Sequence, residues 1–521
     1  TELDRWEITV ADSAGEPLSA TPLAVLARLA LVAAEPEARA VDLLALLRHP
    51  LVSLGLAGAD RAAAVDAIEI AVLRGQRLRG GAEGLAAAVA HARETTPDAR
   101  APFPRRRISA QALAAAAGLA ARLAQALARF AGMWRMPVRL RQAAAAHRVV
   151  LAALLAGEDA DPAAWSGEAG RALTRLFDSI AAAGEDGPTL DPADYRGIFD
   201  QMAGEAVVRS PRPAHPRIKI WGLLEARMLS ADRIILGGLD EGIWPPEARS
   251  DPFLNRPMRL ALGLAPPERR IGQSAHDILM LMGGREVILT RAAKRGGAPA
   301  IASRFLRRLM AYAGAGRVTA LKVRGEPYLR YARLLDRPGT VAAAPRPEPK
   351  VTPALMPPRL SLTEVETLYR DPYAVFARRV LALDVLDPID PPLDARDRGT
   401  VIHDVLAAYV RSQAPGVGPA SEAALLALGR DAFAGLAAED PEAVEFWWRR
   451  FAAFVPWFVG WDAARRQTAQ AVLVETDGAL PLDLAFGHRL TLSTRADRME
   501  QRSDGRLALL DYKTGAPPGN N

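Results

Sequence analysis

Apolar or small residues alternate with polar ones over residues 490–497, which is the pattern of a strand with one buried face. The Ser-Asp-Gly sequence at 503–505 is typical of a turn, and the apolar run at 507–510 predicts a returning strand. The pattern therefore predicts an antiparallel hairpin. With a three-residue loop, Asp497 lies directly opposite Asp511, and the two side chains are about 5 Å apart on one face. A two-residue loop would instead shift the register by one residue and place the carboxylates on opposite faces.

The predicted hairpin gathers charge on one face, because Lys513 follows Asp511 by two residues and shares its side of the strand. Neighbouring carboxylates repel each other unless a cation lies between them, and carboxylate oxygens suit Mg²⁺ or Mn²⁺. Such a metal would hold a phosphate and lower the pKa of a bound water. Lys513 would orient that water or neutralise charge on the phosphate. The alternative is a solvated hairpin whose acids and lysine serve only solubility.

Residues 399–409 predict an amphipathic helix, since their apolar members recur at helical spacing and form one stripe: Ile402, Val405, Leu406 and Tyr409. His403 borders this stripe. A single histidine in that position is more often a packing residue than a metal ligand. The spacing alone therefore favours packing and leaves metal binding as the alternative.

Other patterns divide the chain into segments of different character. Ala and Leu recur at helical spacing over 110–133 and 139–155, which predicts helices. Residues 233–238 are a continuous apolar run ending in glycines, which predicts a buried parallel strand with a loop at its carboxyl end. Aromatic residues recur at helical spacing over 446–461, which favours core packing over base stacking. Prolines cluster at 336–359, which predicts an extended, semi-rigid linker.

Composition restricts the classes of protein to which the chain can belong. Half of its 521 residues are hydrophobic, yet no run of about 18 apolar residues exists, so no membrane span is expected. The start at Thr1 shows no secretory signal, which favours a cytoplasmic protein. The net charge of +6 and the pI of about 9.7 permit a polyanionic partner such as nucleic acid. No Gly-x-x-x-x-Gly-Lys-Ser/Thr loop is present, so the sequence offers no phosphate-binding loop for ATP.

Together these motifs resemble a known family of nucleases. Gly-x-x-x-His at 399–403, Glu475, Asp497 within Arg-Ala-Asp-Arg, and Asp-Tyr-Lys-Thr-Gly at 511–515 resemble the nuclease domain of the RecB-like branch of the PD-(D/E)XK nucleases. Within that branch the chain resembles the AddB family, whose members belong to the bacterial AddAB helicase-nuclease. The resemblance implies that Mg²⁺ or Mn²⁺ is bound by His403, Asp497, Asp511 and the backbone carbonyl of Tyr512. It also implies catalysis by Asp497, Asp511 and Lys513, with Glu475 as an orienting residue at most.

A second set of motifs resembles the second helicase-like domain of superfamily 1 proteins. The likeness is carried by 221–227, 234–245 and 286–291. In the AddB family such RecA-like domains form a DNA-scanning channel that recognises a short recombination hotspot, and they do not drive unwinding themselves. The resemblance implies DNA as a partner, as single strands and duplex ends, and an AddA-like helicase-nuclease subunit. No independent helicase or ATPase activity is expected from this chain.

The chain departs from the family pattern in three places. It has no cysteine, and Asp371 stands where many AddB proteins have a cluster-binding cysteine, so no iron–sulfur cluster is expected. It stops soon after Gly515, whereas the family continues with a helix bearing Gln-x-x-x-Tyr that completes the nuclease site. It begins at Thr1 without a start methionine. The expectation is therefore a fragment that lacks an N-terminal helicase-like domain and whose nuclease site is incomplete.

The sequence thus predicts a multidomain α/β protein with four regions: a mainly helical accessory region at 1–210, a RecA-like α/β helicase-like domain at 211–335, the Pro-rich linker at 336–359, and a PD-(D/E)XK nuclease domain at 360–521. The hypothesis is a metal-dependent DNA exonuclease that serves end resection in homologous recombination as part of a helicase-nuclease complex, associated with the nucleoid in the bacterial cytoplasm. The alternative is a non-catalytic DNA-scanning scaffold with an inactive or incomplete nuclease site. An ATP-driven helicase acting alone is disfavoured by the absent phosphate loop.

Overall fold

The computed structural model describes most of the chain, over residues 3–95, 103–157, 165–182, 187–209, 215–247, 253–266, 268–337, 339–348, 350, 352–383, 385–412, 421–437 and 440–515. By its internal contacts the chain forms two compact units. Unit 1 combines residues 1–25, 162–179 and 197–347, and unit 2 combines residues 26–161, 180–196 and 348–521. Within the described ranges, no helix is both long enough and apolar enough to cross a lipid bilayer.

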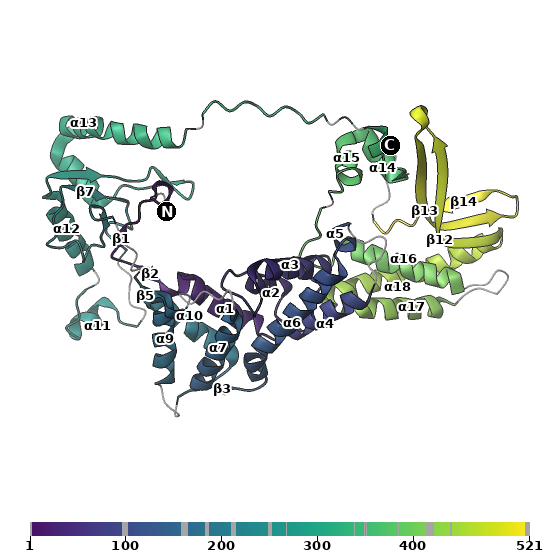
Figure 1. Cartoon of the computed structure of the whole chain (residues 1–521), viewed down its shortest axis with the longest axis horizontal. Coiled ribbons are helices and arrows are strands. Elements are labelled where there is room, and N and C mark those ends of the chain that lie inside the picture. The colour runs from purple at the N-terminus through teal and green to yellow at the C-terminus, as the bar shows by residue number, and fades with distance from the viewer. Residues whose placement is uncertain are drawn as a thin grey trace. The chain divides into compact units, whose positions relative to one another are not determined.

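The N-terminal part of unit 2 is built from helices, drawn in purple to blue in Figure 1. They are α2 (Ala40–Leu47), α3 (Gly58–Ile68), α4 (Gly81–Glu94), α5 (Phe103–Arg106), α6 (Ala110–Ala131) and α7 (Leu140–Leu155), with a π-helical turn at Glu69–Leu73. Ser109 begins α6 by accepting the Ala112 N–H at 3.1 Å. Leu119, Leu123 and Leu127 lie one turn apart along the buried face of α6. The helices predicted at 110–133 and 139–155 are confirmed by α6 and α7.

Unit 1 includes parts of further helices and several two-residue strands. Helices α1 (Pro22–Ala33), α9 (Glu168–Ala181) and α10 (Pro192–Glu205) have residues in both units. The short strand pairs are β1 (Ala11–Asp12) with β6 (Lys219–Ile220), β2 (Glu16–Pro17) with β5 (Val207–Val208), and β9 (Lys294–Arg295) with β10 (Ala298–Pro299). A further pair, β3 (Val138–Arg139) with β4 (Thr189–Leu190), belongs to unit 2.

The α/β part of unit 1 contains a parallel strand pair, β7 (Arg233–Leu236) and β8 (Glu286–Leu289). Its helices are α11 (Arg256–Ala261), α12 (Arg269–Met282) and α13 (Arg304–Leu335), the last broken at Gly314. The parallel direction predicted from the apolar run is confirmed, but the predicted burial is wrong for most of the strand. Only Leu236 is buried, and the Ile235 side chain is 63% exposed. An apolar run alone does not report burial, because burial depends on what packs against each face.

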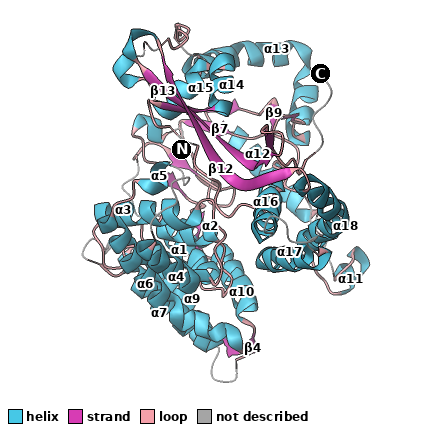
Figure 2. Cartoon of the chain, turned by 90° about the vertical axis from the view of Figure 1, so that its right-hand side faces the viewer, coloured by secondary structure: helices cyan, strands magenta, loops and turns pink. Residues whose placement is uncertain are grey.

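The C-terminal part of unit 2 contains the largest sheet in the described part of the chain. Its strands are β11 (Arg359–Ser361), β12 (Ala469–Asp483), β13 (Arg489–Arg502) and β14 (Leu507–Leu510). The long strand β13 pairs with β12 along one edge, and with β11 and β14 at successive positions along the other. β11 runs parallel to β13, whereas β12 and β14 are antiparallel to it. Figure 2 shows β12 and β13 as the long magenta strands.

The helices that accompany this sheet are α14 (Leu362–Arg370), α15 (Pro372–Arg379), α16 (Ala395–Ser412), α17 (Glu422–Ala437) and α18 (Pro441–Arg466). The last three pack together around one apolar core (Figure 1). Val405, Leu406 and Tyr409 of α16 are buried there, as their predicted stripe requires. The core packing predicted for the aromatic residues of α18 is confirmed for Phe451 and Phe458, which are 3% and 1% exposed. The helix therefore uses its aromatic repeat mainly to hold α16 and α17.

Candidate metal and catalytic site

The hairpin of β13 and β14 determines where the two predicted acids lie. Gln501 stands opposite Leu507, which is the register that a three-residue loop at 503–505 requires. Continued past the end of β14, this register sets Asp497 opposite Asp511, on one face of the hairpin. The prediction of a three-residue loop is therefore confirmed, and the alternative two-residue register is excluded.

Asp497 lies at the centre of the site. Its Oδ1 atom is 3.4 Å from Nδ1 of His403 on α16, and its Oδ2 atom accepts the Tyr512 N–H at 2.5 Å. Both side chains are largely enclosed, with 16% of the aspartate and 25% of the histidine exposed. The histidine ring also meets the Tyr512 ring edge-on, with centroids 6.2 Å apart. His403 therefore packs, as its spacing favours, and at the same time presents a ring nitrogen to the Asp497 carboxylate.

Glu475 joins this pair from β12. The register of β12 with β13 sets it across from Asp497, and Arg495 donates to its Oε2 atom at 2.6 Å. Its φ of +51° lies in the left-handed region, which is uncommon for a residue with a side chain. One ligand atom each from His403, Glu475 and Asp497 lies within 4.8 Å of the others. Sequence reasoning gave Glu475 an orienting role at most, although a lone acid directly after the apolar residues 472–474 was a usable signal.

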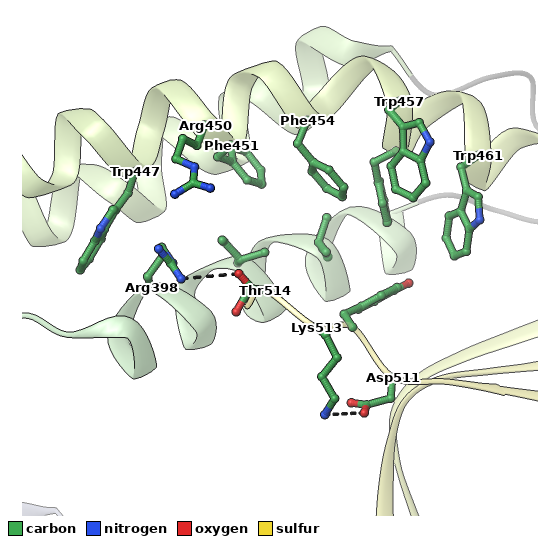
Figure 3. A pocket seen from close by; sticks show the side chains of 14 residues that line it. Arg398, Trp447, Arg450, Phe451, Phe454, Trp457, Trp461, Asp511, Lys513 and Thr514 are labelled. Atoms are coloured by element: carbon green, nitrogen blue, oxygen red, sulfur yellow. Dashed lines mark hydrogen bonds and ion pairs between the residues drawn. The ribbon is translucent and has the colours of Figure 1, made fainter. Parts of the chain in front are cut away.

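Asp511 and Lys513 form an exposed ion pair beside this group (Figure 3). The lysine Nζ atom is 2.5 Å from Asp511 Oδ2. This hydrogen bond, together with one to the Asp497 carboxyl, outweighs burial and holds the pKa of Asp511 below its ordinary value. The same ion pair raises the pKa of Lys513, so the amine is a cation at neutral pH. The structure thus brings His403 and Asp497 together, adds Glu475, and turns the Asp511 carboxylate toward Lys513.

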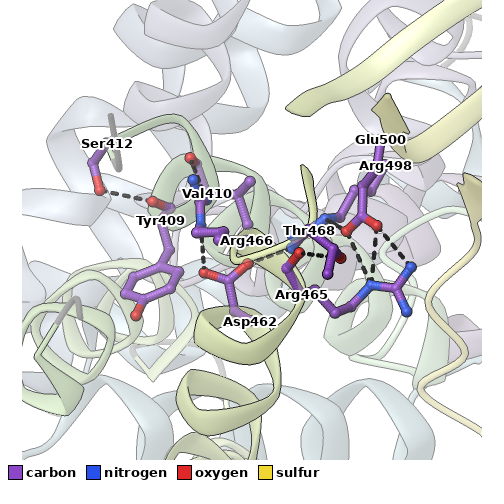
Figure 4. Close-up of polar contacts among 9 residues, drawn as sticks. All are labelled: Tyr409, Val410, Ser412, Asp462, Arg465, Arg466, Thr468, Arg498 and Glu500. Carbon is purple, nitrogen blue, oxygen red and sulfur yellow. Dashed lines mark hydrogen bonds and ion pairs between the residues drawn. The ribbon is translucent and has the colours of Figure 1, made fainter. Parts of the chain in front are cut away.

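A buried ionic network supports the strand that carries Asp497 (Figure 4). Arg498, the next residue, is 0% exposed and lies 2.5 Å from Asp462 of α18 and 2.8 Å from Glu500. Arg465 completes the network with a 2.7 Å contact to Glu500. Burial raises the pKa of Glu500, but the hydrogen bond from Arg465 and the charge of Arg498 outweigh it and hold that pKa below its ordinary value. These pairs fix β13 against α18 and therefore fix the position of Asp497.

The donor set at the site fits a divalent metal ion. Asp497, Glu475 and Asp511 offer carboxylate oxygens, and His403 offers one imidazole nitrogen. Such oxygen-rich sets suit Mg²⁺ and Mn²⁺, whereas softer metals prefer thiolates, which a chain without cysteine cannot supply. A cation held among the carboxylates would also offset their mutual repulsion.

Comparison with known proteins gives the C-terminal region a family. Residues 359–521 match the family model described as the PD-(D/E)XK nuclease superfamily. This region is a PD-(D/E)XK nuclease domain. The nuclease domain contains the whole β11 to β14 sheet and each residue of the candidate site described above.

Relatives extend the similarity beyond the nuclease domain. An uncharacterized protein of Rickettsia felis is 24% identical over 368 residues, which is 68% of this chain and 42% of that protein. An uncharacterized protein of Rickettsia bellii is 22% identical over 357 residues, with the same coverage of both chains. One component of an ATP-dependent helicase/deoxyribonuclease of Streptococcus agalactiae is 28% identical over 171 residues, which is 31% of this chain and 14% of that protein. The chain therefore spans less than half the length of the relatives it matches.

Proposed function

We propose that the nuclease domain hydrolyses DNA phosphodiester bonds with Mg²⁺, as an exonuclease on single-stranded and duplex ends. One observation carries the proposal: ligand atoms of His403, Glu475 and Asp497 lie within 4.8 Å of one another, beside the Asp511–Lys513 ion pair, in a domain of a nuclease superfamily. A hairpin whose charges serve only solubility has no reason to converge with a histidine from α16 and a glutamate from β12. This convergence supports the catalytic interpretation.

The residues of the site have separate roles in the proposed reaction. Four groups would hold the metal: His403, Asp497, Asp511 and the backbone carbonyl of Tyr512, with Glu475 facing the same position. When bound, the metal lowers the pKa of a coordinated water and offsets negative charge on the phosphate. Lys513 is a cation, so it donates to the phosphate oxygen on which charge develops or orients the attacking water. The water oxygen bonds to phosphorus while the bond from phosphorus to the leaving oxygen breaks.

We further propose that the whole protein acts in bacterial DNA double-strand break repair, as one member of a helicase-nuclease complex with an AddA-like partner. The name of the Streptococcus agalactiae relative supports this assignment, as do the helicase-like motifs and the parallel β7–β8 pair. In this proposal a helical accessory region (1–210) and a RecA-like domain (211–335) are joined by the linker (336–359) to the nuclease domain (360–521). The protein would work beside the nucleoid in the cytoplasm, and this chain would hydrolyse no ATP by itself.

Cleavage of end-labelled single- and double-stranded DNA tests the proposed activity. The chain is expected to release short products with Mg²⁺ and none with EDTA. Asp511→Ala is expected to lower the rate by roughly 100-fold or more, because a misplaced metal loses transition-state stabilisation. DNA binding in EDTA should persist, since phosphate contacts outside the site remain. Asp504→Ala, in the loop of the same hairpin, is the matched control and should cleave normally. Wild-type cleavage by Asp511→Ala would contradict the assignment.

A second candidate function is a non-catalytic scaffold that scans DNA. The observation that favours it is the exposed ion pair of Asp511, whose carboxylate faces Lys513 instead of the other ligand atoms. The same assay separates the candidates. A scaffold would bind DNA equally well as wild type and as Asp511→Ala, and neither protein would cleave with Mg²⁺ or Mn²⁺.

A further inference from the structure

A cavity of about 400 Å³ opens beside Asp511 and Lys513, between α18, α16 and the segment that follows β14 (Figure 3). Its walls have two characters. Aromatic rings of α18 line one side, and charged side chains of α16, α18 and the 511–514 segment line the other. A volume near 400 Å³ falls within the usual range for small-molecule sites, roughly 300–1,000 Å³. The cavity is therefore large enough for one nucleotide.

The aromatic wall is only partly explained by core packing. Phe451 and Phe458 belong to the core, but Trp457 is 60% exposed and still lines the cavity. Its ring is stacked with that of Trp461, with centroids 5.9 Å apart and planes inclined by 19°. An exposed indole beside a second, nearly parallel indole gives a flat apolar surface that water covers poorly. Such a surface suits a planar ligand, and every nucleobase offers a π-face that stacks on aromatic side chains.

The charged wall is predominantly positive. Among the lining residues, Arg398, Arg450 and Lys513 are cations and Asp511 is the one carboxylate. Arg398 donates to the Thr514 carbonyl at 3.5 Å, which ties α16 to the segment after β14. The Arg450 guanidinium lies over the Phe446 ring, 5.6 Å from its centroid. A cationic wall that faces an aromatic wall complements a nucleotide, since the phosphate is anionic and the base is planar and apolar on its faces.

We propose that this cavity binds one unpaired nucleotide of the DNA strand that reaches the metal site, with its base stacked on Trp457 and its phosphate toward Arg398 and Arg450. The inference rests on the proposed nuclease function, and it names the form of DNA that the site accepts. A base within a duplex is paired and stacked on both faces, so it cannot enter a one-nucleotide cavity until the strand has opened. The site therefore selects single-stranded DNA over intact duplex.

Binding measurements without metal test the subsite independently of cleavage. The probe is a fluorescent oligothymidylate, compared with an abasic strand of equal length and charge, by anisotropy in EDTA. Wild type is expected to bind the thymidylate more tightly, and Trp457→Ala to weaken that binding by roughly 5- to 150-fold per stacked base. Binding of the abasic strand should not change. Trp457→Phe, which keeps a ring, should restore most of the preference.

The matched control is Trp6→Ala, because Trp6 is 58% exposed, as Trp457 is, and lies outside the cavity. Equal binding of thymidylate and abasic strands by the wild-type chain would overturn the subsite, whether or not any variant folds. Equal losses in Trp457→Ala and Trp6→Ala would overturn it as well. A base preference that depends on Trp457 in a chain that cleaves nothing with Mg²⁺ would reject the nuclease function and keep the nucleotide site. Cleavage that shows no base preference would do the reverse.

Discussion

At the scale of single residues, the sequence identifies the acids of the site but not their exact partners. Asp497 and Asp511 could be predicted because strand alternation and turn composition determine which residues face each other across a hairpin. The role of Glu475 could not be predicted, since it depends on a left-handed backbone conformation within β12 that no alternation pattern reveals. The ion pair between Asp511 and Lys513 likewise follows from side-chain orientation and not from spacing alone.

Glu475 is expected to contribute to metal binding. Glu475→Gln removes one negative charge from the group that it forms with His403 and Asp497, so the metal should bind more weakly. We expect the Mg²⁺ concentration that gives half-maximal cleavage to rise by roughly 10-fold or more. Titration of cleavage against Mg²⁺ measures this shift.

The control for that titration is Asp477→Asn on the same strand, because the Asp477 side chain is 72% exposed and it is not among the ligand atoms that converge. Its Mg²⁺ dependence should match that of the wild type. If both variants shift equally, the effect is general electrostatics and Glu475 is no ligand.

At the scale of helices and strands, local patterns predicted the elements and long-range packing decided their burial. The helices α6 and α7 and the β13–β14 hairpin follow from periodicity and turn chemistry. Ile235 shows the limit of such patterns, since it lies in an apolar run yet is 63% exposed. The ionic network around Arg498 was also beyond sequence reasoning, because its members come from α18 and β13, which are far apart in the sequence.

Arg498 is expected to be the main stabilising residue of this network. Arg498→Ala leaves the Asp462 and Glu500 carboxylates buried with one cation fewer, so we expect a loss of about 3–5 kcal/mol in the free energy of unfolding. Urea denaturation monitored by tryptophan fluorescence measures this loss. Arg489→Ala on the same strand is the control, since it breaks an ion pair with Asp483 in which both side chains are at least 75% exposed. A similar small loss in both variants would contradict the role assigned to Arg498.

At the scale of the whole molecule, the units are assembled from separated parts of the chain. Unit 1 draws on three segments, so its composition is not visible in any one stretch of sequence, and only tertiary contacts reveal it. The whole chain has 66 Lys and Arg residues against 60 Asp and Glu residues, an excess of only six positive charges. Long-range attraction for DNA is therefore modest, and the local placement of a few cations decides where phosphates bind.

The salt dependence of DNA binding should therefore report on the individual cations of the cavity. Each phosphate contact on a single strand contributes about 0.7 to the slope of log affinity against log salt concentration. Arg450→Ala should lower the slope by about that amount, because a lost phosphate contact releases fewer counterions. Arg449→Ala is the control, since Arg449 is the neighbouring residue of α18, is 77% exposed and does not line the cavity. Trp457→Ala should weaken binding at every salt concentration with no change in slope, because stacking on a base releases no counterion. Equal slopes for wild type and Arg450→Ala would place the phosphates elsewhere and reject the cationic wall as their binding surface.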